Sequence, residues 1–162
     1  MAEALDFVVG LGSNLGDRHE HLYRAVRALR EVFDVRAVSR VYETAPVGPP
    51  QPDYLNAAVR ARADLSPDEV LRVLLDVEQR GGRIRSPETR WGARTVDLDL
   101  LWAKGVVMST PELTIPHPRL LERGFALLPL LDVAPEAEDP RTGSHFLAPQ
   151  PDQAVRALSL LL

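Results

Sequence analysis

The sequence has no cysteine among its 162 residues and only one lysine, Lys104. Without cysteine, neither a disulfide framework nor a thiolate metal site can form, which is typical of a reducing compartment. No apolar run approaches the roughly 20 residues that a membrane span requires. The opening residues "MAEALDFVVGLGSN" lack the basic segment and the long apolar stretch of a secretory signal. We therefore expect a cytoplasmic protein with no membrane partner.

The charge balance is slightly acidic, with a formal net charge of -4. This balance argues against a general nucleic-acid binder, whose surface is usually basic, so we expect no nucleic-acid partner. Arginine supplies nearly all of the positive charge, and its guanidinium group suits bidentate phosphate contacts better than lysine does. The length favours a single domain, residues 1–162, that is large enough to bury a core without disulfides or metals.

Strand-like and helix-like patterns alternate along the chain without repeats. The predicted elements are a strand over 5–13, a helix over 16–33, a strand over 35–45, a strand over 54–63, a helix over 66–82, a strand over 95–102, and helical turns with proline breaks over 119–136. The loop 46–53 is rich in proline and separates two strands that could lie side by side and antiparallel. The alternation predicts a small α/β or α+β sheet with helices packed on it.

The two long helices carry recognisable start signals. Asp17, with Glu20 three residues later, is a candidate cap for the first helix, and an apolar stripe follows at Leu22, Val26, Leu29 and Phe33. Ser66 and Glu69 have capping-box spacing at the start of the second helix. The residues predicted to face inward from that helix are Val70, Leu71, Leu74 and Leu75.

The stretch "TVDLDLLW" places two aspartates in an otherwise apolar strand. Residues two apart in a strand share a face, so Asp97 and Asp99 point to one side while Leu98 and Leu100 point to the other. The two carboxylates are then roughly 6–7 Å apart at the backbone, close enough to share one hard cation or to bridge two. A solvated acidic face with surface salt bridges is the alternative interpretation.

Arginines precede the aspartate pair in "GRIRSPETRWGART", which carries Arg83, Arg85, Arg90 and Arg94. Guanidinium groups supply the permanent charge and forked donors that a polyphosphate requires. Magnesium prefers one or two carboxylates together with water and substrate phosphates. The combination favours a magnesium–polyphosphate site over a merely solvated face.

Four blocks of this sequence, in the same order, resemble the 6-hydroxymethyl-7,8-dihydropterin pyrophosphokinase family. They are "GLGSNLGD", "YETAPVGPPQPDYLNAAV", "GRIRSPETRWGARTVDLDLLW" and "IPHPRLLERGFALLPLLDVAPE", and together they cover roughly Gly10 to Glu136. Several long motifs in register are far more specific than one short motif. The resemblance implies an α+β, single-domain, ferredoxin-like α/β/α sandwich with a mainly antiparallel sheet. It also implies a cytoplasmic monomer that transfers pyrophosphate from ATP to the pterin hydroxymethyl group and releases AMP.

The resemblance also implies the site. Asp97 and Asp99 match the residues that hold two Mg²⁺ ions, and with Arg83 and Arg94 they form the catalytic set. The positions that match the nucleotide side are Glu78, Arg85, Arg90, Trp91, Leu100, His117 and Arg123. The positions that match the pterin pocket are Thr44, Val47, Tyr54, Asn56 and Phe125.

Elementary chemistry agrees with the pterin assignments. A pterin is flat, and the rings of Tyr54 and Phe125 could stack on it, while Asn56 offers both a donor and an acceptor. Two alternatives remain open at this point. The sheet could bind single-stranded RNA by stacking, although the acidic balance counts against this. A different magnesium-dependent phosphoryl or nucleotidyl transferase could also use an Asp-x-Asp strand, and only the pterin pocket separates it.

Overall fold

A computed structural model describes residues 4–44, 53–82, 96–118, 120, 124–147 and 155–162. Its helices and strands are β1 (Leu5–Ser13), α1 (Arg18–Val32), β2 (Asp34–Val38), β3 (Val41–Thr44), β4 (Tyr54–Ala63), α2 (Pro67–Gly82), β5 (Asp97–Ala103), β6 (Met108–Ser109), β7 (Thr114–Ile115), α4 (Gly124–Val133) and β8 (Val155–Leu158). No helix in these ranges has the length and apolar character needed to cross a bilayer.

One antiparallel sheet organises the fold. Its strand order is β5-β1-β4-β3-β8, and β2 pairs with β4 beside β3. The order of elements from β1 to β5 is strand, helix, strands, helix, strand. β1 lies between β5 and β4 in the sheet, which is the arrangement of the ferredoxin-like split βαβ motif. The predicted α+β class with a mainly antiparallel, ferredoxin-like sheet is confirmed.

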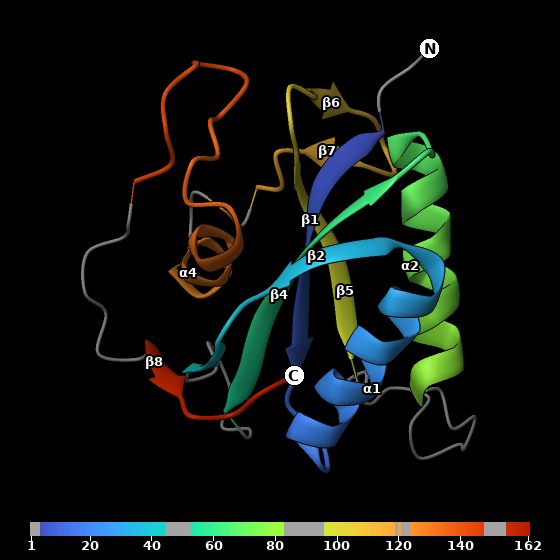
Figure 1. Ribbon diagram of the computed structural model, residues 1–162, viewed down its shortest axis with the longest axis vertical. Helices are drawn as coiled ribbons and strands as arrows, with labels where there is room; N and C mark the ends of the chain where they lie inside the picture. The colour runs from blue at the N-terminus through green and yellow to red at the C-terminus, as the bar shows by residue number, and fades with distance from the viewer. Residues whose placement is uncertain (1–3, 45–52, 83–95, 119, 121–123, 148–154) are drawn as a thin grey trace.

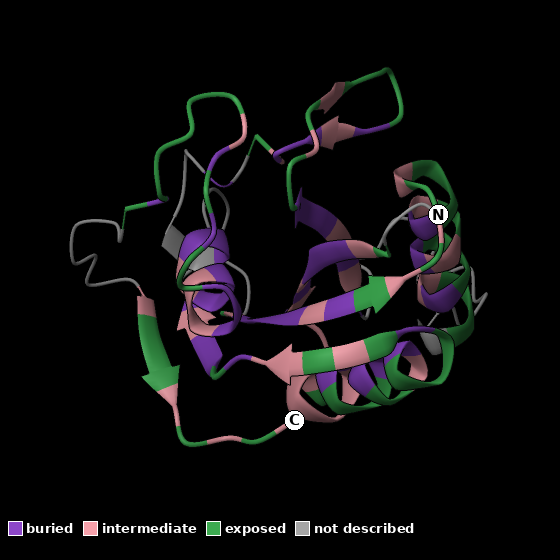
Figure 2. Ribbon diagram, turned by 45° about the horizontal axis from the view of Figure 1, so that its top comes forward, coloured by how far each residue is buried: buried purple, intermediate pink, exposed green. Residues whose placement is uncertain are grey.

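The helices form layers on both faces of this sheet (Figure 1). α1 and α2 pack on one face, and α4 packs on the other. Figure 2 shows buried residues along the sheet and on the sheet-facing sides of the helices, with exposed residues outward. The predicted α/β/α sandwich is therefore confirmed, and each face of its sheet has its own apolar cluster.

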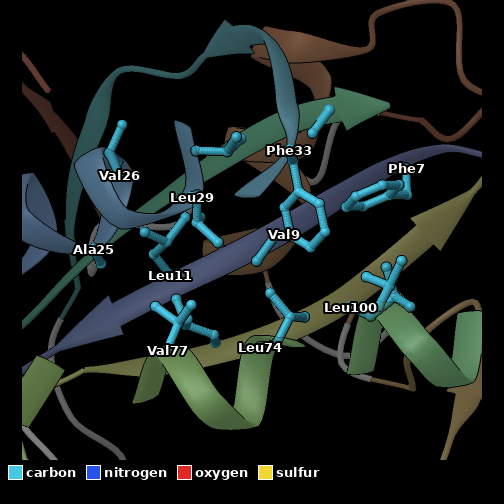
Figure 3. Packing of buried hydrophobic residues seen from close by; sticks show 14 of the residues in the cluster. Phe7, Val9, Leu11, Ala25, Val26, Leu29, Phe33, Leu74, Val77 and Leu100 are labelled. Carbon is cyan, nitrogen blue, oxygen red and sulfur yellow. The ribbon is translucent and has the colours of Figure 1, made fainter. Parts of the chain in front are cut away.

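The main core fills the face beneath α1 and α2 (Figure 3). The apolar stripe of α1 is buried as predicted, and the ring of Phe33 meets that of Phe7 edge-on with centroids 5.0 Å apart. Asp17 caps α1 by accepting the backbone N–H of Glu20. The cap explains why the helix begins after Asp17, and the apolar stripe explains which side of the helix is buried.

α2 begins with the predicted capping box. The Ser66 hydroxyl accepts the Glu69 N–H, and the Glu69 carboxylate accepts the Ser66 N–H. The inward stripe is Val70, Leu74 and Val77, all buried. The prediction that Leu75 faces inward is wrong, since its side chain is 48% exposed. Leu75 lies about 100° around the helix from Leu74, which already fills the core-facing position.

The single strand predicted over 35–45 is two strands, β2 and β3, with a break at Ser39. The Ser39 hydroxyl accepts the Ala58 N–H and donates to the Arg40 carbonyl. These bonds take up backbone groups that a continuous ladder would pair, and a side chain that competes in this way favours a bend. The register of β2 against β4 is also irregular between Val35 and Ala37.

The C-terminal third differs most from its sequence-based interpretation. Helical turns were expected over 119–136, and α4 occupies Gly124–Val133 within that range, with Pro129 inside it. The strand β8, which extends the sheet beyond β3, was not predicted.

A partly buried ion pair joins β4 to β1 and to the segment after α4. Arg60 donates two hydrogen bonds to the Asp6 carboxylate, at 3.0 and 2.9 Å, and one to Glu136. Its guanidinium also lies 5.8 Å from the centre of the Trp102 ring. The Asp6 carboxylate is only partly solvated, which opposes its ionisation. The hydrogen bonds and charge of Arg60 outweigh this effect, so the pKa of Asp6 lies below its ordinary value of 3.8.

This ion pair predicts a pH-dependent stability. Asp6→Asn should lower the free energy of unfolding by about 2 kcal/mol at pH 7, because hydrogen bonds to charged groups contribute about 1.5–3 kcal/mol. A carboxylate with a lowered folded pKa stabilises the fold above its unfolded pKa, and that stabilisation disappears as pH falls through the folded value. Urea denaturation should therefore show the difference shrinking below about pH 4. Asp34→Asn, in an exposed pair with Arg36, is the control and should stay within about 0.5 kcal/mol.

Candidate active site

The two aspartates share one face of β5 opposite the leucines, as predicted, and this face is the α4 side of the sheet. Leu98 and Leu100 are buried in the core under α1 and α2, whereas Asp97 and Asp99 are half-exposed on the opposite face. In the register with β1, Asp97 is opposite Gly12 and Asp99 is opposite Gly10. The apolar residues thus fix the strand, and the carboxylates cannot turn inward without exposing two leucines.

Gly12 lies on the sheet between the aspartates and β4 and carries no side chain. It is paired with Asp97 on one side and with Asn56 on the other. A Cβ at Gly12 would come 3.1 Å from the Asn56 amide oxygen and 3.9 Å from the Tyr54 ring. Asp97, Asn56 and Tyr54 therefore share one face, with about 10 Å between the backbones of Asp97 and Asn56.

Asn56 and Thr44 form a polar pair on this face. The Asn56 amide donates to the Thr44 hydroxyl over 2.8 Å, and both side chains are buried. Tyr54 begins β4 two residues before Asn56, is half-buried, and pairs with Thr44. Three residues predicted for the pterin pocket are thus in contact or adjacent.

A β-bulge in β5 lies just after Asp99. The register shifts so that Leu100 pairs with Val9 but Trp102 pairs with Val8, which leaves Leu101 as an extra residue. Leu101 packs over Gly10, where a Cβ would come within 2.8 Å of its side chain. The Leu101 carbonyl accepts the backbone N–H of His117. His117 Nε2 then lies 3.9 Å from Asp99 Oδ1.

Glu78 reaches from α2 to the backbone of β5. Its carboxylate accepts the Leu98 N–H over 2.7 Å, between the two aspartates in the sequence. Because backbone direction alternates along a strand, Leu98 and Leu100 both present their N–H and C=O groups away from β1. The Leu100 side chain is buried, so a ligand at this edge would meet its backbone.

Several predicted site residues lie outside the described residues. They are Val47, Arg83, Arg85, Arg90, Trp91, Arg94 and Arg123. Phe125 lies near the start of α4. Their roles stay predictions, as do those of Glu78, Leu100 and His117 on the nucleotide side.

The sequence analysis did not identify Gly12 as the residue that lies between Asp97 and Asn56 in the sheet. Its signal was present, because Gly10 and Gly12 are two apart in a strand and so lie on the same face. The Glu78–Leu98 bond had no such signal, since it joins positions 20 residues apart.

Comparison with known proteins decides the family. Residues 8–135 match the family model of 7,8-dihydro-6-hydroxymethylpterin-pyrophosphokinase (HPPK). This chain belongs to the HPPK family.

Curated HPPK relatives agree with the family model. A 2-amino-4-hydroxy-6-hydroxymethyldihydropteridine pyrophosphokinase from Synechocystis sp. is 45% identical over 142 residues, covering 86% of this chain and 72% of the relative. One from Bacillus subtilis is 41% identical over 140 residues, covering 85% and 83%.

Solved HPPK structures support the fold. A Plasmodium falciparum HPPK-DHPS with pterin and p-hydrobenzoate has a TM-score of 0.67 at 14% identity, covering 90% of this chain and 44% of that chain. An HPPK-DHPS in complex with substrates also has a TM-score of 0.67 at 14% identity, with 90% and 42% covered. This chain spans less than half the length of those solved chains, and at this identity the likeness concerns the fold.

The Glu78–Leu98 bond leads to a prediction with a built-in control. Glu78→Ala leaves a partly buried N–H without its acceptor, which costs about 1–3 kcal/mol. Glu78→Gln retains a carbonyl oxygen and should lose less than half as much. Urea denaturation of both variants measures the difference. Equal losses in the two variants would show that the charge of Glu78, and not its acceptor, stabilises β5.

Proposed function

We propose that the α4-side face around Gly12 is the active site, with Asp97 and Asp99 on its phosphate side and Thr44, Tyr54 and Asn56 on its pterin side. The reaction is that of the family: pyrophosphate passes from ATP to the hydroxymethyl group of 6-hydroxymethyl-7,8-dihydropterin in folate biosynthesis. The products are AMP and the pterin diphosphate. One observation carries the site assignment, namely that Gly12 pairs with both Asp97 and Asn56 on a single face.

The aspartate pair suits Mg²⁺. In the described part of the chain, no three His, Cys, Asp or Glu side chains gather as a metal cage. Two half-exposed carboxylates on one face are the donor set that Mg²⁺ takes when water and substrate phosphates complete its shell. We assign two ions to Asp97 and Asp99. Bound there, Mg²⁺ would neutralise phosphate charge and acidify a coordinated hydroxyl.

The pterin side offers matching polar and flat surfaces. Asn56 donates one amide hydrogen to Thr44. An asparagine amide has a second N–H and a carbonyl oxygen, which suit the amide and amino edge of a pterin. Tyr54 supplies a ring beside that edge, and we assign Phe125 as the opposing ring and Val47 as an apolar wall.

The nucleotide lies, in this proposal, along the outer edge of β5. The outward backbone of Leu100 can pair with the edge of a base, Glu78 anchors the strand, and His117 stands beside Asp99. The residues assigned to the triphosphate and to its enclosure are Arg83, Arg85, Arg90, Trp91, Arg94 and Arg123.

Catalysis then rests on positioning and charge. The hydroxymethyl oxygen must be in line with the β-phosphorus, and charge develops on the oxygen that leaves with AMP. Arg83 and Arg94 are assigned to follow that charge, because fixed cations stabilise a transition state without reorganising. A ligand held by Asn56 and phosphates held at Asp97 would approach each other over Gly12, which itself carries no side chain.

The remaining assignments concern the whole chain. We propose a cytoplasmic monomer whose residues 1–162 form one domain, without a nucleic-acid or membrane partner. Sedimentation at micromolar concentration would test the oligomeric state.

The function is tested by removing each aspartate's charge. Asp97→Asn and Asp99→Asn should each lower turnover by at least about 100-fold, because each removes a ligand for the charge-neutralising cations. Both variants should stay folded, and relief of carboxylate repulsion can even raise their melting temperature without metal. Chromatography should show AMP and pterin diphosphate in equal amounts from the unmutated protein.

Asp34→Asn, at an exposed carboxylate of β2, is the matched control and should retain full turnover. ADP as the main product would contradict the proposed reaction. Unfolding of both aspartate variants would instead assign Asp97 and Asp99 a structural role.

A further inference from the structure

The C-terminal strand β8 lies beside β3 at the sheet edge opposite β5. Thr44 pairs with Val155, and Glu43 pairs with Arg156. The strand lies outside residues 8–135, the part of the chain that matches the family model. β8 is therefore an addition to the matched region that adjoins a residue of the proposed pterin side.

The Glu43 carboxylate lies between two arginines from different elements. Arg156 of β8 donates to Oε1 through Nε at 3.1 Å and Nη2 at 2.5 Å. Arg18, the first residue of α1, donates to Oε2 at 3.3 Å. The hydrogen bonds from Arg156 are the largest cause that holds the pKa of Glu43 below its ordinary value.

Arg18 also contacts the residue just before β4. Its Nη1 donates to the Asp53 carbonyl over 2.6 Å, immediately before Tyr54 begins the strand. One guanidinium thus joins the last residues of β3 to the residue that precedes β4. Behind it, His19 contacts the Leu161 carbonyl at 2.8 Å, which brings the end of the chain to the start of α1.

These contacts lie on the reverse side of the pterin residues. Adjacent residues in a strand point to opposite faces, so Glu43 points toward α1 while Thr44 points toward α4. The cluster of Arg18, Glu43 and Arg156 therefore does not line the proposed pocket. It sets the spacing of the two strand ends that present Thr44 and Tyr54.

We propose that Arg18, Glu43 and Arg156 are positioning residues for the pterin, and that β8 is the element that completes them. The inference rests on the proposed pterin side of the active site. The inference distinguishes the two substrates, because Glu43 adjoins Thr44 and Arg18 contacts the residue before Tyr54. Along the path of the sheet, Glu43 on β3 is three strands from Asp97 on β5, and Arg156 on β8 is four strands from it.

Steady-state kinetics with each substrate varied in turn tests the proposal. Glu43→Ala removes the shared acceptor and should raise the KM for the pterin at least about fivefold, the factor that about 1 kcal/mol represents. The KM for ATP and kcat should stay within about twofold. Arg156→Ala should give a smaller rise in the same constant, and Arg156→Lys should restore part of it, since lysine keeps the charge without the forked donors.

Asp34→Ala and Arg36→Ala are the controls, because they break an exposed pair of 2.7 Å on β2 of the same sheet. Unchanged pterin KM in the Glu43 and Arg156 variants would overturn the inference while the proposed function stands. A parallel rise in both KM values with a lower melting temperature would show a merely structural cluster, which also overturns it. Absence of AMP formation by the unmutated protein would instead contradict the proposed function itself.

Discussion

The alternation of side chains along β5 is the constraint on which the proposed active site depends. Leu98 and Leu100 are buried against α1 and α2, and their burial contributes about 1.5–3 kcal/mol each. A slip of one residue would expose both leucines and bury both aspartates, which is unfavourable on each count. The direction in which Asp97 and Asp99 point is therefore set by the apolar face of the sheet, not by any ligand.

Because side chains alternate along the strands, the two faces of the sheet differ in polarity. The face beneath α1 and α2 holds the larger apolar cluster and most of the packing. The face beneath α4 is apolar near Val8, Leu101 and Trp102 but becomes polar toward Asp97 and Asn56. The proposed active site thus lies at one end of a sheet whose other face packs against α1 and α2, so the residues proposed to act on substrate need not also form the main apolar core.

Local patterns predicted what depends on local physics. The caps of α1 and α2, the inward stripe of α1 and the common face of Asp97 and Asp99 follow from periodicities of 3.6 and 2 residues. Contacts between distant positions were not accessible in this way. Ser39 breaks a strand by bonding to Ala58, Glu78 holds the backbone of Leu98, and β8 joins β3 across more than 100 residues. Family resemblance, rather than geometry, supplied the residues predicted for the pterin pocket, and the structure brings three of them, Thr44, Tyr54 and Asn56, together.

We propose that phosphate and pterin meet over Gly12, and turnover after a side chain is placed there tests this proposal without an intermediate step. Gly12→Val puts a Cβ 3.1 Å from the Asn56 amide oxygen and adds two methyl groups at the position that pairs with both Asp97 and Asn56. We expect at least about a 100-fold loss of AMP formation, a transition-state cost of about 2.7 kcal/mol, in a protein that still folds. A folded Gly12→Val variant that keeps turnover within about twofold of the unmutated protein would contradict it.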